Sequence, residues 1–599
     1  MVSAEPSYRG AAPGKARPAE GRAHLGRAPA VRLAFAWLAM TLVLVALAAP
    51  AIALERIHVL APLFFLIQDA PVLAGICGLA ALCLAWPKAT AFSGAALERL
   101  GRWLVAWRAP PPLTLWAAIG GVFVVSLAGA VFSAAAYPLS VDEFLAGFDA
   151  EIFRHGWAMA PVPAPWRVFV PALQPMFLLP IDGNAWWASA YLPVNAAFRA
   201  LAPDEAWARL VNPAWSALAI AAVWGVARRL WPERPSVALL AAVLLATSTQ
   251  VLLTAMTSYA MPAHLALNLA WLWLFLRGGK LGNGGAVLVS LLACGLHQLV
   301  FHPLFAGPFI LQLWLDRRWR LASFYSLALG AIVVFWLLYW SFLMRWLGAG
   351  PPPPGPADAG GVLARLIGLV SPLGPLDVSI MALNLIRLAT WQNLLAAPLF
   401  VVGAAAAWRS GGALRALVAG LALTVFVSFL LMPYQGYGWG YRYVHGLLGS
   451  VALVAAWQWS RWTEACPERA RSAALGAFAV SAAASILILL PARLAQASAW
   501  SAPYERASAA IAGAHADVVL LDETGIWFGE HLVRNDPFLR NRPLVLDAEK
   551  LTPAQVRALC ARYAVAVFDR ASAARLGVRT IAQAPRGLSL AACGPRPRL

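Results

Sequence analysis

Apolar runs close to 20 residues long recur along this 599-residue chain, and they constrain its fold more than any other feature. A helix of about 20 apolar residues spans the hydrocarbon core of a bilayer. The chain is 61% hydrophobic and 12% charged, whereas soluble domains are roughly half apolar and a quarter charged. The sequence therefore predicts an all-α multi-pass membrane protein rather than a soluble fold.

We expect about 11 to 13 transmembrane helices, because about thirteen segments are apolar enough to span. The candidate spans are 33–53, 66–87, 112–135, 207–227, 236–257, 261–276, 285–301, 303–315, 321–344, 392–408, 413–432, 443–460 and 472–491. Two of them, 261–276 and 303–315, are short for a membrane-spanning helix.

The distribution of Lys and Arg predicts the orientation of these spans. If residues 1–32 are a cytoplasmic tail, the inner segments up to residue 491 carry more than twice as many basic residues as the outer ones. Cytoplasmic loops are the ones enriched in Lys and Arg. The positive-inside rule also explains the net charge of +19 without nucleic acid, and no soluble segment carries a basic stripe with interleaved aromatics. We therefore expect an inner (cytoplasmic) membrane protein with a cytoplasmic N-terminus and an extracytoplasmic C-terminus.

Four regions follow from this pattern. We expect a disordered basic tail at 1–32, two N-terminal spans at 33–111, a membrane core at 112–491 with an outer loop at 136–206, and a soluble extracytoplasmic domain at 492–599. The last region is polar and contains strand-like runs at 518–521, 544–546 and 564–568, and a helix opened by Thr552 and Pro553. It is predicted to be a small α/β domain.

The six cysteines fit these compartments. Cys560 and Cys593 are the only two in a predicted outer segment, where disulfides form, so we expect them to be bridged. No CxxC or Cys/His cluster indicates a zinc site. The chain also lacks a P-loop, a nucleotide-binding GxGxxG and a GxSxG motif.

The sequence SVDEF at 140–144 places two carboxylates, Asp142 and Glu143, just beyond the outer end of a span. A carboxylate that close to hydrocarbon is costly unless it is solvated or used. Two interpretations stay open. The segment is an acidic helix N-cap, or one carboxylate is a general base at the membrane surface. A divalent metal held by both side chains is left open as well.

Arg442 lies at another outer helix junction, in the sequence PYQGYGWGYRYVH at 433–445. The positive-inside rule disfavours an arginine there, and an arginine at membrane depth usually has an anionic partner. That partner is a protein carboxylate or a lipid phosphate, which the guanidinium fork suits. Other polar groups that gather at predicted outer helix ends are Tyr259, His264, His297 and His302.

The remainder of the outer loop, 136–206, interleaves aromatic residues with prolines. It fits an interfacial aromatic belt, and it fits equally a rigid aromatic-walled groove for sugars or lipid chains.

Together these motifs resemble the GT-C glycosyltransferases, namely bacterial relatives of protein O-mannosyltransferases and lipid A aminoarabinose transferase. The matching residues are Asp142, Glu143, Ala150 and Gly156, then RRLWP at 228–232, SYAMPAH at 258–264 and GWGYRY at 438–443. The resemblance covers roughly 112–460. Ala146 stands where the family often has Tyr, and His302 stands where it has Arg before Pro.

The resemblance implies a sugar transferase that works with inversion at the outer membrane face. The donor would be a sugar on a polyprenyl phosphate, and the acceptor a lipid, glycan or protein. Asp142, with Glu143 beside it, would supply the general base. Arg442, Tyr441 and His302 would bind the donor phosphate, and Tyr191, Tyr259, His264 and His297 would line the substrate groove.

Two other functions are a flippase for lipid-linked glycans and an inactive scaffold that presents the C-terminal domain. A flippase would show polar midplane residues and internal repeats, which the sequence does not show. The transferase mechanism requires Asp142 and Arg442 to share one site, so a separation beyond about 20 Å would exclude electrostatic catalysis by the pair.

Overall fold

The computed structural model describes residues 28–53, 60–85, 87–107, 111–173, 175–347 and 374–582. Most of these residues are helical. Within these ranges, seven helices are long and apolar enough to cross a membrane, and the bent pair α11 (Pro235–Ala246) and α12 (Thr249–Ala255) makes an eighth if counted as one span. The predicted polytopic all-α fold with a small α/β domain is therefore confirmed.

Fewer helices pass this length test than the 11 to 13 expected. Five predicted spans form helices of only 15 to 17 residues. They are α13 (Met261–Arg277), α14 (Gly279–Cys294), α15 (Phe301–Leu315), α19 (Ala396–Ser410) and α21 (Leu448–Glu464). The predicted span 236–257 is bent by 57° after α11. Ser248 begins α12 there by accepting a hydrogen bond from the Val251 N–H.

The longer spans are close to prediction. They are α1 (Ala28–Ala53), α5 (Pro111–Phe132), α10 (Val211–Leu230), α16 (Trp319–Trp346) and α20 (Gly412–Leu431). Two helices lie between predicted spans: α4 (Pro87–Trp107) before the span 112–135, and α18 (Pro375–Thr390) before the span 392–408. Neither helix was predicted.

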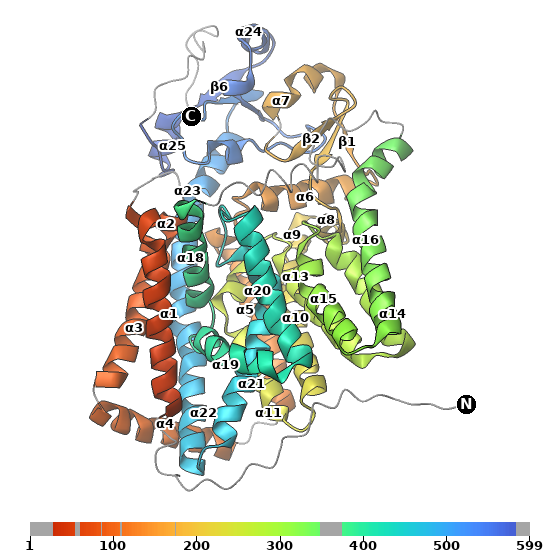
Figure 1. Ribbon diagram of the computed structural model, residues 1–599. Helices are drawn as coiled ribbons and strands as arrows, with labels where there is room; N and C mark the ends of the chain where they lie inside the picture. The colour runs from red at the N-terminus through yellow and green to blue at the C-terminus, as the bar shows by residue number, and fades with distance from the viewer. Residues whose placement is uncertain are drawn as a thin grey trace.

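The N-terminal helices pack against parts of the chain that are distant in sequence. The second span runs through α2 (Leu60–Phe64), the π-helical turn η1 (Phe65–Asp69) and α3 (Ala70–Ala85). Figure 1 shows α1 beside α18, and α4 lies along α22 (Glu468–Ala484), which leads into α23 (Leu490–Ala512). This arrangement brings residues before 112 close to the loop that follows α20.

The loop 136–206, which we predicted to lie outside, contains a short amphipathic helix and a small sheet. Helix α6 (Val141–Arg154) lies at the boundary between the spanning helices and the cap above them (Figure 1). The antiparallel sheet has the order β1-β3-β2, with β1 at Ala160–Pro161, β3 at Trp186–Ser189 and β2 at Leu178–Ile181. Helix α8 (Val194–Ala200) leads back toward the core.

The C-terminal region matches its prediction closely. Three parallel strands, β4 (Val518–Leu521), β5 (Leu544–Asp547) and β6 (Val565–Phe568), form a sheet with the order β5-β4-β6. Thr552 caps α24 (Pro553–Arg562) in a reciprocal capping box with Gln555. The preceding span continues as helix from Glu468 to Ala512, past the predicted boundary at 491. Cys560 is disulfide-bonded, and its expected partner Cys593 lies outside the described residues, so that pairing stays a prediction.

The loop 136–206 and the C-terminal domain share one apolar core. Trp187 of β3 is fully buried and donates from its indole N–H to the Pro537 carbonyl at 2.7 Å. Trp166 stacks on Tyr563 with ring centroids 5.2 Å apart. These two side chains therefore pack the loop onto the C-terminal domain. Trp157 and Phe177 of the same loop are about half exposed, so for them the belt and the groove both stay open.

Candidate functional site

The site begins at the N-terminus of α6, where the sequence places three polar residues in one turn. Ser140 is the N-cap: its hydroxyl accepts from the Glu143 N–H at 3.2 Å, and the Glu143 carboxylate accepts from the Ser140 N–H at 3.3 Å. This reciprocal capping box satisfies N–H groups that the first helical turn leaves free. Glu143 is 2% exposed. The cap interpretation therefore holds for Ser140 and Glu143.

Asp142, between them, faces a different set of partners. One carboxylate oxygen lies 2.8 Å from Nη1 of Arg442, and the other accepts a hydrogen bond from the Tyr191 hydroxyl. The Arg442 side chain is 8% exposed and that of Asp142 17%. Residues 300 positions apart in the chain thus form one ion pair, and the sequence prediction that Asp142 and Arg442 lie together is met.

The backbone before Arg442 holds its side chain in place. Arg442 donates through Nη2 to the Gln435 carbonyl, and its own N–H donates to the Gln435 side chain at 2.8 Å. Gly438 has φ +150°, and a Cβ there would lie 2.2 Å from Arg442 Cδ. Only glycine fits this close approach. Among the described residues, the buried Nε of Arg442 has no hydrogen-bond partner, so the guanidinium keeps a donor for a further acceptor.

Aromatic side chains complete the surroundings of the pair. The Tyr191 ring stacks on His297 with centroids 4.0 Å apart. Arg442 lies over the Tyr259 ring at 5.1 Å, and the Tyr259 hydroxyl donates to the Tyr437 carbonyl at 3.3 Å. The ring nitrogens of His297 have no partner within the described residues. Tyr191, Tyr259 and His297, which we predicted to line the groove, are thus brought together.

Three predicted site residues lie elsewhere. His302 is fully buried, with its ring nitrogens 2.8 Å from Asn268 Oδ1 and 2.9 Å from Ser290 Oγ, so no ring nitrogen is left for a phosphate. The Tyr441 side chain is also fully buried, and its hydroxyl contacts Met381 Sδ at 3.5 Å. His264 is buried edge-on against Phe301. We therefore no longer assign the phosphate to His302 or Tyr441.

The local charges set distinct protonation states for the carboxylates of α6. Burial disfavours the charge of Asp142, but the Arg442 guanidinium, His297 and the hydrogen bond from Tyr191 outweigh it and hold the pKa of this carboxyl below its usual value. Burial raises the pKa of Glu143 to about 7. The site thus pairs an ionised Asp142 with a capping Glu143 that takes up a proton near neutral pH.

The raised pKa of Glu143 predicts that stability depends on pH. Between the ordinary value of 4.5 and about 7, the folded protein keeps a proton that the unfolded chain has lost. Stability therefore falls as the pH rises through this window, by on the order of 3 kcal/mol. Glu143→Gln preserves the capping box, so we expect it to stabilise the protein at pH 8 and hardly at pH 4.5. Thermal unfolding of the purified protein at both pH values measures this, and an unchanged pH dependence would contradict it.

The carboxylates do not fit a metal site. Asp142 and Glu143 point to different partners, the first to Arg442 and the second to the Ser140 backbone. Within the part of the chain that the structure describes, no group of three or more His, Cys, Asp or Glu side chains is placed to hold a metal ion. We therefore derive no step through a metal.

A cavity of about 460 Å³ lies between α6 and the C-terminal domain. Its walls include Glu143, Phe144 and Phe148 of α6, Ser258 and Arg534. The lining includes Glu143, the sequence neighbour of Asp142, and Ser258, the sequence neighbour of Tyr259, but not Asp142 or Arg442 themselves.

Sequence reasoning missed a second group of buried charges beside the site, formed by Asp69, Arg387 and Arg493. Two signals were present. Asp69 interrupts the predicted span 66–87, where a carboxylate is costly, and Arg387 lies close to the start of the predicted span 392–408.

No family model matches the chain, and no curated protein matches it. Two solved structures of ArnT from Cupriavidus metallidurans are similar to it. The crystal structure bound to undecaprenyl phosphate has 13% sequence identity, covers 73% of this chain and 85% of its own, and gives a TM-score of 0.47. The apo structure has 12% identity, covers 74% of this chain and 91% of its own, and gives a TM-score of 0.43.

Proposed function

We propose that this protein is a membrane glycosyltransferase of the GT-C type, which moves a sugar from a polyprenyl phosphate to a hydroxyl acceptor at the outer face of the membrane. The observation that carries the proposal is the ion pair between Asp142 and Arg442 at 2.8 Å. It brings a carboxylate and a guanidinium, the two groups that a base and a phosphate-binding cation require, into one partly exposed site at the end of the spanning helices.

Arg442 binds the donor phosphate in this proposal. Its Nε is an unused buried donor, and the guanidinium fork matches two phosphate oxygens. The lipid chain enters sideways from the bilayer, so the phosphate reaches Arg442 at membrane depth. As the sugar leaves, negative charge grows on the phosphate, and a fixed cation stabilises it.

Asp142 takes the acceptor proton. In the free protein Arg442 lowers the pKa of Asp142, which makes the carboxylate a weak base. When the phosphate accepts the hydrogen bonds of Arg442, the strongest of the groups that lower the pKa of Asp142 is engaged elsewhere while burial still disfavours the charge, so the basicity of Asp142 rises. The acceptor oxygen then attacks the anomeric carbon with inversion while its proton passes to Asp142. The bond from the anomeric carbon to the phosphate oxygen breaks, and its electron pair stays on the polyprenyl phosphate.

We place the acceptor in the cavity between α6 and the C-terminal domain. Its walls come from α6, the loop before α13, the end of α23 and the C-terminal domain. Phe144 and Phe148 offer apolar faces, and Ser258 and Arg534 offer hydrogen-bond donors, a combination suited to a polar, hydroxyl-bearing molecule.

Reconstituted protein supplied with radiolabelled polyprenyl-phosphate sugars tests this function. We expect release of polyprenyl phosphate and label in an acceptor. Movement of the lipid-linked sugar across the bilayer without release of polyprenyl phosphate would identify a flippase instead. Neither transfer nor movement with any donor would favour a scaffold.

The outer location of the site makes a separate prediction. Ala574 in the C-terminal domain and Ser410 at the end of α19 are both exposed, and we place them on opposite sides of the membrane. In intact cells, a membrane-impermeant thiol reagent should label Ala574→Cys and should label Ser410→Cys only after permeabilisation. The reverse pattern would invert the topology and place the site on the cytoplasmic face.

A further inference from the structure

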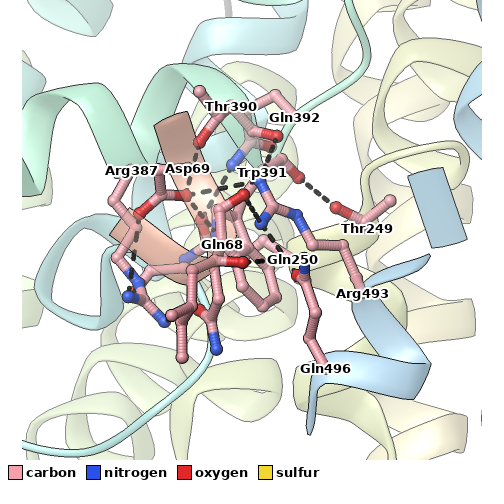
Figure 2. A network of polar contacts seen from close by, with 12 residues as sticks. Gln68, Asp69, Thr249, Gln250, Arg387, Thr390, Trp391, Gln392, Arg493 and Gln496 are labelled. Atoms are coloured by element: carbon pink, nitrogen blue, oxygen red, sulfur yellow. Dashed lines mark hydrogen bonds and ion pairs between the residues drawn. The ribbon is translucent and has the colours of Figure 1, made fainter. Parts of the chain in front are cut away.

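Three charged side chains from separate elements meet in the protein interior beside the site (Figure 2). Asp69 ends η1, Arg387 belongs to α18 and Arg493 to α23. The Asp69 carboxylate lies 3.8 Å from Arg387 Nη1 and 3.3 Å from Arg493 Nη2, and each of the three side chains is at most 4% exposed. The same carboxylate accepts hydrogen bonds from the Thr390 hydroxyl at 2.7 Å and the Trp391 indole at 2.9 Å.

The cluster has two guanidinium groups for one carboxylate, and their other donors bond to backbone carbonyls and to the side chains of Gln68 and Gln496. Arg493 donates to the carbonyls of Gln68 at 2.7 Å and Thr390 at 3.1 Å. Arg387 donates instead to the carbonyls of Gly438 at 2.9 Å and Gly440 at 3.1 Å. Only the second arginine therefore bonds to the segment that leads into Arg442.

A neutral side chain fixes the same segment from another direction. Gln250 of α12 donates to the Tyr441 carbonyl at 2.8 Å, and a Cβ at Gly440 would lie 2.3 Å from the Gln250 side chain. Three carbonyls within residues 438–441 are thus held by Arg387 and Gln250. Because Gly438 packs directly on Arg442 Cδ, any shift of this segment moves the guanidinium.

We propose that Arg387, held by Asp69 of the second N-terminal span, is a positioning residue for Arg442 and thereby sets the affinity for the donor phosphate. This inference rests on the proposed function only in naming a phosphate as the ligand of Arg442. The positioning of Arg442 by Arg387 does not depend on it. The N-terminal span lies outside the region that resembles the transferase core, so its role here is to hold a site built by other helices.

A matched pair of arginine variants tests the proposal in full-length protein in lipid nanodiscs. Arg387→Lys and Arg493→Lys both keep the charge next to Asp69, and both lose the planar fork. Hydrogen exchange of the amides in 435–445 and binding of undecaprenyl phosphate are measured in each. We expect Arg387→Lys to speed exchange in this segment at least tenfold and to weaken binding at least tenfold. Arg493→Lys should leave both close to wild type.

A second pair avoids altering a buried charge. Gln250→Met removes the donor to the Tyr441 carbonyl, while Thr249→Val removes a hydroxyl that donates to the Trp391 carbonyl at 2.8 Å. Both side chains are fully buried on the same short helix. Faster exchange in 435–445 for Gln250→Met alone supports the proposal, and equal effects of the two variants overturn it.

Arg442→Gln provides the internal control. If Arg387 acts through Arg442, Arg387→Lys should weaken undecaprenyl phosphate binding no further in the Arg442→Gln background. Equal changes in Arg387→Lys and Arg493→Lys, or none in either, would overturn the positioning role. A third outcome is faster hydrogen exchange in Arg387→Lys alone, with no binding of undecaprenyl phosphate by the wild type. It would support the positioning role of Arg387 and reject the donor of the proposed function.

Discussion

Replacing Asp142 by Asn is expected to lower the rate of sugar transfer by about 10²–10⁴-fold, the usual contribution of a positioned general base. Asn has nearly the same shape and still accepts the hydrogen bond that the Tyr191 hydroxyl donates to Asp142. What it loses is the ability to take the acceptor proton. Transfer of radiolabelled sugar at saturating donor measures the effect. Donor binding should survive, because the Arg442 guanidinium is then no longer paired with a charged carboxylate.

Asp149 offers a matched control on the same helix. It is also buried, and its carboxylate accepts hydrogen bonds from the hydroxyl and the N–H of Ser189. Asp149→Asn makes the same chemical change two turns from the site, and we expect transfer within a few-fold of wild type. Turnover that survives in Asp142→Asn, or falls equally in Asp149→Asn, would reject Asp142 as the base.

Much of the fold could be predicted because hydrophobic pattern decides it. The apolar runs, the strands β4 to β6 and the helix capped by Thr552 all follow from local sequence. Helices α4 and α18 were missed. Helix α4 carries several Lys and Arg residues, so it does not read as a membrane span, and α18 is short and contains charged residues.

The site was predicted only in part, because the local sequence pattern does not show which side chains pack against one another. The pair Asp142 and Arg442 could be expected, since each is a costly charge at the same membrane face. Neighbouring helices decide where two other side chains lie. They bury the Tyr441 side chain, and they supply Asn268 and Ser290 as the partners of His302. The bond from Arg387 to two glycine carbonyls likewise appears only in three dimensions.

Arg442→Gln is expected to reduce transfer by about 10²–10³-fold, as removal of one stabilising donor in a preorganised site does. The transfer rate of Arg442→Lys should also fall well below that of wild type. An ammonium cannot hold Asp142, the Gln435 carbonyl and a phosphate in fixed directions. Unlike Asp142→Asn, both variants should weaken undecaprenyl phosphate binding. Arg154, which pairs with Glu151 at 2.8 Å on the same helix as Asp142, supplies a control: Arg154→Gln should leave binding unchanged.

Stability must be separated from chemistry in this experiment, because Arg442→Gln leaves Asp142 without its cation. Breaking a largely buried ion pair costs about 3–5 kcal/mol, less where water reaches the carboxylate, whose side chain is 17% exposed. The double variant Asp142→Asn with Arg442→Gln replaces both charges by amides and should recover most of that stability. It should not recover transfer or lipid binding. If restoring the thermal stability also restored undecaprenyl phosphate binding, Arg442 would act by supporting the fold, and the phosphate would have to bind elsewhere.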